Sequence, residues 1–92
     1  MLALSRRLHE SVIIGERVEI EVTAIGHDQV ELTVTELDGG QSRQEKFASG
    51  EKRPVTPEIV VAIGRMFDRK VQICLDVPRQ INIRRKELPE PR

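Results

Sequence analysis

The stretch that decides the fold is MLALSRRLHESVIIG, residues 1–15. Apolar and polar side chains alternate along residues 2–5, and a short apolar run at residues 12–14 ends at Gly15. A period of two is typical of β-strands, because successive side chains point to opposite faces of a sheet. These residues therefore predict the first two strands of an antiparallel sheet joined by a tight connection.

The same alternation continues further along the chain. Residues 18–23 and 30–35 alternate on either side of Gly26-His27-Asp28, which predicts a turn. Alternation returns over residues 71–77 and 81–84, separated by a predicted turn at Pro78-Arg79-Gln80. We therefore expect a mostly β protein with a small antiparallel five-stranded fold. Two segments, 27–34 and 69–77, compete to be its fourth strand, and the second leads directly into the last strand.

The middle of the chain has a different character. Residues 38–54 are polar and contain glycine, with Phe47 as their one large apolar side chain, which predicts a long surface loop whose deletion leaves folding nearly intact. Thr56-Pro57-Glu58 is typical of a helix start. Apolar residues follow at helical spacing and predict a short helix over about 57–68, namely Ile59, Val60, Ile63, Met66 and Phe67. We expect one domain, 1–92, interrupted by an insertion at about 35–70.

Composition limits the function classes. With two Phe, no Trp and no Tyr, the core must consist of Val, Ile and Leu, and so small a core favours a dimer. The single cysteine, Cys74, cannot form an internal disulfide. No apolar run approaches the ~18 residues of a membrane span, and no secretory signal is present, so we expect a cytoplasmic protein without membrane contact. Neither His9 nor His27 has metal-ligand spacing to a second ligand, and no phosphate-binding glycine loop is present. We expect no enzyme, no metal, no cofactor and no small-molecule substrate.

The charges are balanced in number but not in position. The chain has 15 basic and 15 acidic residues, and its net charge is zero. Arg6 and Arg7 lie near the start, Arg79 and residues 84–86 lie near the end, and residues 10–38 are rich in acids. Charge alone is more typical of a solvated surface. The two basic ends would nevertheless form one basic surface if the first and last strands lay side by side.

Residues 1–15 resemble the start of CsrA/RsmA proteins, whose pattern is M-L-x-L-[ST]-R-[RK]-x-G-E-[ST]-x-x-I-G. Residues 77–88, VPRQINIRRKEL, are similar to that family's A-P-x-x-[VI]-x-[VI]-x-R-x-E-[IL]. The resemblance covers residues 1–34 and 71–88. Three departures stand out: His9 replaces a usual Gly, Arg84 replaces a frequent His, and residues 35–70 have no counterpart.

The resemblance implies a homodimer with interleaved strands, in which the first strand of one subunit lies beside the last strand of the other and each edge binds RNA. It implies a bacterial translational regulator that recognises GGA in hairpin loops of mRNA leaders and represses translation or alters mRNA stability. Small regulatory RNAs are a second class of ligand that the resemblance implies. Carried over by position, the RNA-binding residues are Leu4, Arg6, Arg7, Ile83, Arg84, Arg85 and Glu87.

Two other functions remain open. The chain could be a family-derived protein-interaction module that has lost RNA binding and modulates other family members, or a small DNA-binding β-ribbon protein. The intact basic set at residues 6, 7, 84 and 85 favours RNA binding, because a degenerate copy has little reason to keep it.

Overall fold

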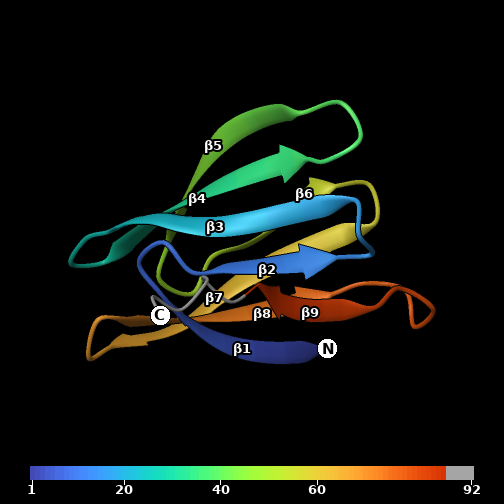
Figure 1. Ribbon diagram of the computed structural model, residues 1–92. Helices are drawn as coiled ribbons and strands as arrows, with labels where there is room; N and C mark the ends of the chain where they lie inside the picture. Colours follow the sequence, from blue (N-terminus) through green and yellow to red (C-terminus); the bar gives the residue numbers. More distant parts are fainter. Residues whose placement is uncertain (87–92) are drawn as a thin grey trace, which may run out of the picture.

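Residues 1–86, the part that the computed structural model describes, fold into two antiparallel sheets (Figure 1). One sheet has the strand order β1-β8-β7-β6 and the other has the order β5-β4-β3-β2-β9. The strands are β1 (Leu2–Arg7), β2 (Ser11–Ile14), β3 (Val18–Ile25), β4 (Gln29–Glu36), β5 (Gln41–Ala48), β6 (Lys52–Thr56), β7 (Ile59–Phe67), β8 (Lys70–Asp76) and β9 (Ile83–Lys86).

Strands with a clear period of two are confirmed. In β3 the side chains of Val18, Ile20 and Val22 are buried, while the intervening positions are partly exposed. The same pattern holds in β4 and β8, because each of these strands has one face against the core. Both candidates for a fourth strand are therefore strands, and they lie in different sheets.

The predicted helix over 57–68 is wrong, and the described residues contain no helix. Residues 59–67 form β7, which pairs with both β6 and β8. Ile59, Val61 and Ile63 are buried and alternate with half-buried neighbours, so their true period is two. A run of β-branched residues favours this extended conformation, and it outweighs the helix-start signal at residues 56–58.

The predicted surface loop over 38–54 is also wrong, and so is the number of five strands. Residues 41–48 form β5, which pairs with all of β4 from Gln29↔Ala48 to Glu36↔Gln41. Most of β5 is exposed, because it is an edge strand and only Phe47 enters the core. Backbone pairing with β4 therefore orders a segment whose polar side chains gave no sign of a strand.

The core lies between the two sheets and is aliphatic except for Phe47. It takes side chains from both sheets, including Val12, Ile20, Leu32, Val61, Ile73 and Leu75, all of which are at most 1% exposed. Burial of such side chains contributes about 1.5–3 kcal/mol each. Phe47 in β5 is fully buried in the same core, so the middle of the chain is part of it.

Candidate nucleic-acid interface

The two basic ends of the chain lie on edge strands. β1 is the edge of one sheet, where Leu4 pairs with Ile73 of β8, and β9 is the edge of the other, where Arg85 pairs with Val12 of β2. One side of each edge strand lacks a strand partner within residues 1–86. Both strands therefore offer backbone N–H and C=O groups to a ligand.

A tight turn links β1 to β2 and fixes their ends. The Arg7 backbone N–H donates to Glu10 Oε1 at 2.7 Å, and the Glu10 N–H donates to the Arg7 carbonyl at 3.0 Å. His9 has a φ of 68°, the left-handed region in which Gly is preferred. Its N–H donates to the Val22 carbonyl at 2.7 Å, and its Nδ1 lies 3.2 Å from Glu21 Oε2. These two contacts hold His9 in a conformation suited to glycine.

Arg6 connects the end of β1 to the start of β2, the strand that pairs with β9. Its side chain is only 8% exposed; Nε donates to the Ser5 carbonyl at 2.9 Å and Nη1 donates to the Ser11 carbonyl at 3.4 Å. Ser11 in turn pairs with Lys86 of β9. Arg6 Nε also lies 3.8 Å from Glu10 Oε1, so the guanidinium is engaged within the protein. The Arg6–Ser11 hydrogen bond thus holds the end of β1 against the start of β2, the strand that pairs with β9.

Two basic side chains of β9 are engaged in ion pairs on the outer face of their sheet. Arg84 Nε and Nη2 donate to the Glu16 carboxylate at 2.6 and 2.9 Å, and Lys86 Nζ donates to Glu19 at 3.2 Å. The hydrogen bond from Arg84 lowers the pKa of the Glu16 carboxyl, and the same bond raises the pKa of Arg84. An incoming anion would have to compete with Glu16 for the Arg84 guanidinium.

Arg85 is placed differently. Side chains alternate along β9, so Ile83 and Arg85 point to the face opposite Arg84 and Lys86. Ile83 packs against the core on that face, whereas Arg85 is exposed. Arg85 forms no ion pair within residues 1–86, unlike Arg84 and Lys86. Its guanidinium is therefore the more available of the two predicted arginines on β9.

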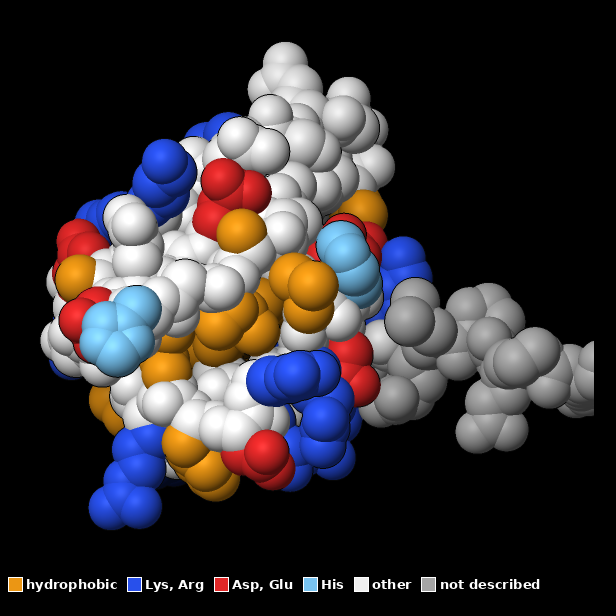
Figure 2. Space-filling model, turned by 90° about the vertical axis from the view of Figure 1, so that its left-hand side faces the viewer, with side chains coloured by type: hydrophobic (Ala, Val, Ile, Leu, Met, Phe, Trp, Pro, Cys, Tyr) orange, Lys and Arg blue, Asp and Glu red, His pale blue; other side chains and the backbone are white. Residues whose placement is uncertain are grey.

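Basic side chains also gather at the end of the molecule where β1 finishes. Arg7 is exposed and pairs with Lys70 at the start of β8, directly after Arg69 in the β7–β8 turn. Figure 2 views this end and shows several Lys and Arg side chains close together, with acidic side chains beside them. This basic cluster extends the β1 edge.

The remaining predicted residues have varied placements. Leu4 is half-buried and packs against the core, as does Ile83. Glu87 lies outside the described residues. Sequence reasoning did not select Ser11, Lys70 or Lys86. Lys86 could have been found beside Arg85, but only the β1–β8 pairing reveals Lys70.

A groove of about 980 Å³ opens at the opposite end of the molecule, among the β2–β3, β4–β5 and β6–β7 turns and the β8–β9 connection. Ile83 and Arg84 lie on its rim. No group of three or more His, Cys, Asp or Glu among residues 1–86 could hold a metal ion. Within the same residues no helix is long and apolar enough to cross a membrane.

Comparison with known proteins gives one match. The model of the CsrA family, described as a global regulator protein family, matches residues 1–41. No curated protein and no solved structure matches the chain. The matched range contains Leu4, Arg6 and Arg7 on β1, and it ends before β6, β7, β8 and β9.

Proposed function

We infer that this chain, whose residues 1–41 match the CsrA family, belongs to the CsrA/RsmA proteins and binds GGA-containing hairpin loops in mRNA leaders along β1 and β9. The family consists of RNA-binding post-transcriptional regulators that are not enzymes. The observation that supports the proposal best is the convergence of two basic edge strands at Ser11, with Arg85 exposed and outside the ion pairs of its neighbours.

The geometry suits unpaired loop bases rather than a duplex. Bases splayed out of a hairpin loop expose hydrogen-bonding edges, which the free backbone groups of β1 and β9 can pair with. Arg7 and Arg85 are exposed beside these edges and can meet phosphates. Phe47 is fully buried, and Phe67, which is exposed, lies on β7 rather than on β1 or β9, so the proposal places recognition in backbone and arginine contacts rather than in aromatic stacking.

Such binding would regulate translation directly. A protein seated on a GGA that overlaps a ribosome-binding site blocks initiation, and on other leaders it alters mRNA lifetime. We place this activity in the cytoplasm of a bacterium, with mRNA leaders as targets and small regulatory RNAs as competing ligands. The family resemblance implies a homodimer, and the strand pairing within one chain, described in the next subsection, argues for a monomer instead.

Fluorescence anisotropy with a labelled GGA-loop hairpin tests the proposal. The control hairpin keeps the stem and changes only the loop triplet, and both are measured at the same salt concentration. We expect the control to bind at least about tenfold more weakly, the discrimination given by a loss of roughly 1.4 kcal/mol. Equal affinity would refute recognition of GGA, and no RNA binding would favour the protein-interaction module. Displacement of the hairpin by duplex DNA at equal concentration would favour the β-ribbon reading.

A further inference from the structure

Much of the second part of the chain repeats the first at an offset of 41 residues. Adding 41 to each buried position of β3 and β4 gives a buried position of β7 or β8. The pairs are Val18 and Ile59, Ile20 and Val61, Val22 and Ile63, Val30 and Val71, Leu32 and Ile73, and Val34 and Leu75.

The strand pairings repeat with the same offset. Ser11↔Glu21 between β2 and β3 becomes Lys52↔Ala62 between β6 and β7, and Val22↔Leu32 becomes Ile63↔Ile73. The irregularity after Val22 in β3 recurs after Ile63 in β7. A shared register through several strands, including a bulge, indicates two copies of one structural unit.

The turn after β1 has a copy after β5. The Ala48 backbone N–H donates to Glu51 Oε1 at 2.9 Å, as the Arg7 N–H does to Glu10. Gly50, with a φ of 84°, occupies the place of His9 and donates to the Ile63 carbonyl at 2.9 Å. β5 is therefore the counterpart of β1, and residues 43–76 correspond to residues 2–35 of the first unit instead of interrupting it.

The two units exchange strands. β1 pairs with β8 of the second unit, and β5, its counterpart, pairs with β4 of the first unit. Leu2↔Leu75 corresponds to Arg43↔Val34, so even the registers match. β9 likewise joins β2 of the first unit. The exchange of strands that the resemblance implies between two subunits thus occurs inside one chain.

The two edges of this arrangement are not equivalent. Where β1 carries Arg6 and Arg7, β5 carries Phe47 and Ala48. β9 extends the sheet beyond β2, but no strand within residues 1–86 extends the other sheet beyond β6. The positions that correspond to β9 in the first unit are 42–45, and these already belong to β5 in its pairing with β4.

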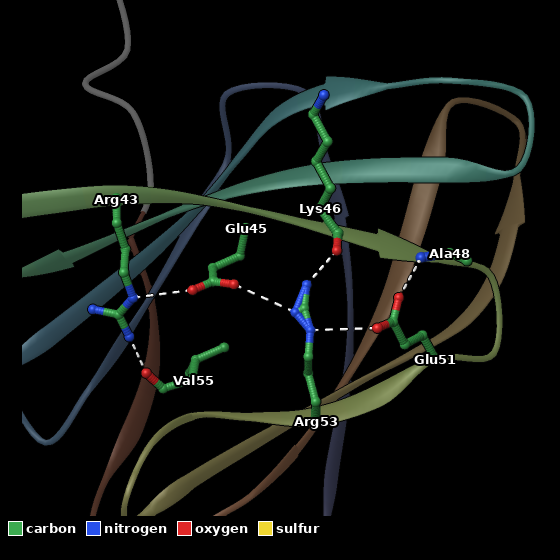
Figure 3. A network of polar contacts seen from close by, with 7 residues as sticks. All are labelled: Arg43, Glu45, Lys46, Ala48, Glu51, Arg53 and Val55. Atoms are coloured by element: carbon green, nitrogen blue, oxygen red, sulfur yellow. Dashed lines mark hydrogen bonds and ion pairs between the residues drawn. The ribbon is translucent and has the colours of Figure 1, made fainter.

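Side chains take the place of the missing strand (Figure 3). Arg43 of β5 donates to the Val55 carbonyl of β6, and Arg53 of β6 donates to the Lys46 carbonyl of β5. Glu45 lies 3.1 Å from Arg43 and 3.3 Å from Arg53, and the Arg53 guanidinium stacks over Phe47 at 4.0 Å. Both guanidinium groups are thus engaged within the protein, where the β1/β9 edge leaves Arg85 exposed.

We propose that the chain is a single-chain counterpart of a dimer, which folds and works as a monomer and carries one RNA site, at the β1/β9 edge. The single RNA site rests on the proposed function, whereas the monomeric state does not. These two claims are the second and the first part of the proposal. A particle with one site represses one hairpin at a time and cannot bridge two sites in one leader. It would also lack the gain in affinity that bivalent binding gives.

Sedimentation of the free full-length protein at micromolar concentration tests the first part. We expect one species with the chain mass of 10.5 kDa. A species of twice that mass would overturn the monomer. This readout needs no RNA, so it stays informative if the proposed function fails.

Native mass spectrometry and binding to RNAs with one or two GGA hairpins test the second part. We expect one hairpin per chain and only the statistical factor of about two for the two-hairpin RNA, whereas two sites in one particle would give about 10²–10⁴. A matched pair of variants locates the site. Arg85→Ala should weaken binding at least tenfold, and the double substitution Lys46→Ala and Lys52→Ala should leave it within twofold.

Lys46 and Lys52 are exposed on the β5/β6 edge, so their loss does not disturb the core. An avidity gain, two hairpins per chain, or weaker binding by the lysine variant would overturn the single site. Absence of binding to either RNA by a 10.5 kDa species would instead refute the proposed function and the single site with it, and leave the monomer standing.

Discussion

Substitution of Arg85 by Ala is the sharpest test of the RNA-binding edge. Arg85 is exposed on β9, and it pairs with Val12 of β2, which is fully buried. The side chains of Arg84 and Lys86 point to the opposite face of the strand. Truncation at the Cβ removes the guanidinium without opening the core, so the free energy of unfolding should change by no more than about 0.5 kcal/mol.

The expected loss in RNA binding follows from the type of contact. A hydrogen bond to a charged group is worth about 1.5–3 kcal/mol, which corresponds to roughly a ten- to 150-fold rise in Kd. No ion pair of Arg85 within residues 1–86 has to be broken before it binds. Arg84 is the matched comparison, because its bond to Glu16 must be given up, and Arg84→Ala should therefore cost less than Arg85→Ala.

Anisotropy titrations of both variants with the GGA hairpin, repeated over a range of salt, measure these effects. For Arg85→Ala the slope of log K against log salt should fall by about 0.7, the value for one phosphate on a single strand. Unchanged Kd and slope, with the fold intact by circular dichroism, would show that Arg85 does not contact RNA. A larger loss for Arg84→Ala would mean that the outer face of β9 is the binding face.

Three further perturbations test the site and the fold. Glu16→Gln should raise RNA affinity by a few-fold at most, because it releases Arg84 for phosphates; a decrease would mean that the ion pair orients Arg84 for binding. Arg84 lowers the folded-state pKa of Glu16 below 4.5, so the ion pair stabilises the fold above pH 4.5 and this stabilisation is lost as the pH falls through the lowered pKa. Acid unfolding curves of Glu16→Gln should therefore lack this part of the pH dependence. Ile63→Ala should lower the free energy of unfolding by about 2–5 kcal/mol in denaturant titrations, since Ile63 is buried in β7, whereas a loss under about 1 kcal/mol would mean that β7 is not part of the core. Deletion of residues 38–54 should abolish cooperative folding, because it removes β5 and most of β6; retention of a sharp unfolding transition would contradict the pairing of β4 with β5.

The sequence predicts the strands that alternate and misses those that do not. β3, β4 and β8 follow from buried residues at every second position. The sequence does not reveal β7 as a strand, because apolar residues occupy both of its faces and some of these residues also follow helical spacing. β5 was hidden because an edge strand needs few apolar side chains.

The 41-residue repeat was open to detection, since the aliphatic positions of residues 18–34 recur in residues 59–75. Polar positions differ between the copies, because exposed side chains are not fixed by packing, and this conceals the repeat. The arginines at both ends could be selected from the family pattern. The bond between Arg84 and Glu16 could not, because only the β2–β9 pairing brings these distant residues together.

The pairing of Leu2 with Leu75 has a consequence for how the protein is made. During synthesis β1 leaves the ribosome well before its partner β8, because β2 to β7 lie between them in the sequence. The meander of β2, β3, β4 and β5 can form early from local contacts, whereas closing the sheet around β1 requires contacts distant in sequence and is the slower step. The proposed RNA-binding edge is therefore incomplete in a nascent chain until β8 and β9 have left the ribosome, and any silencing of a message could begin only then.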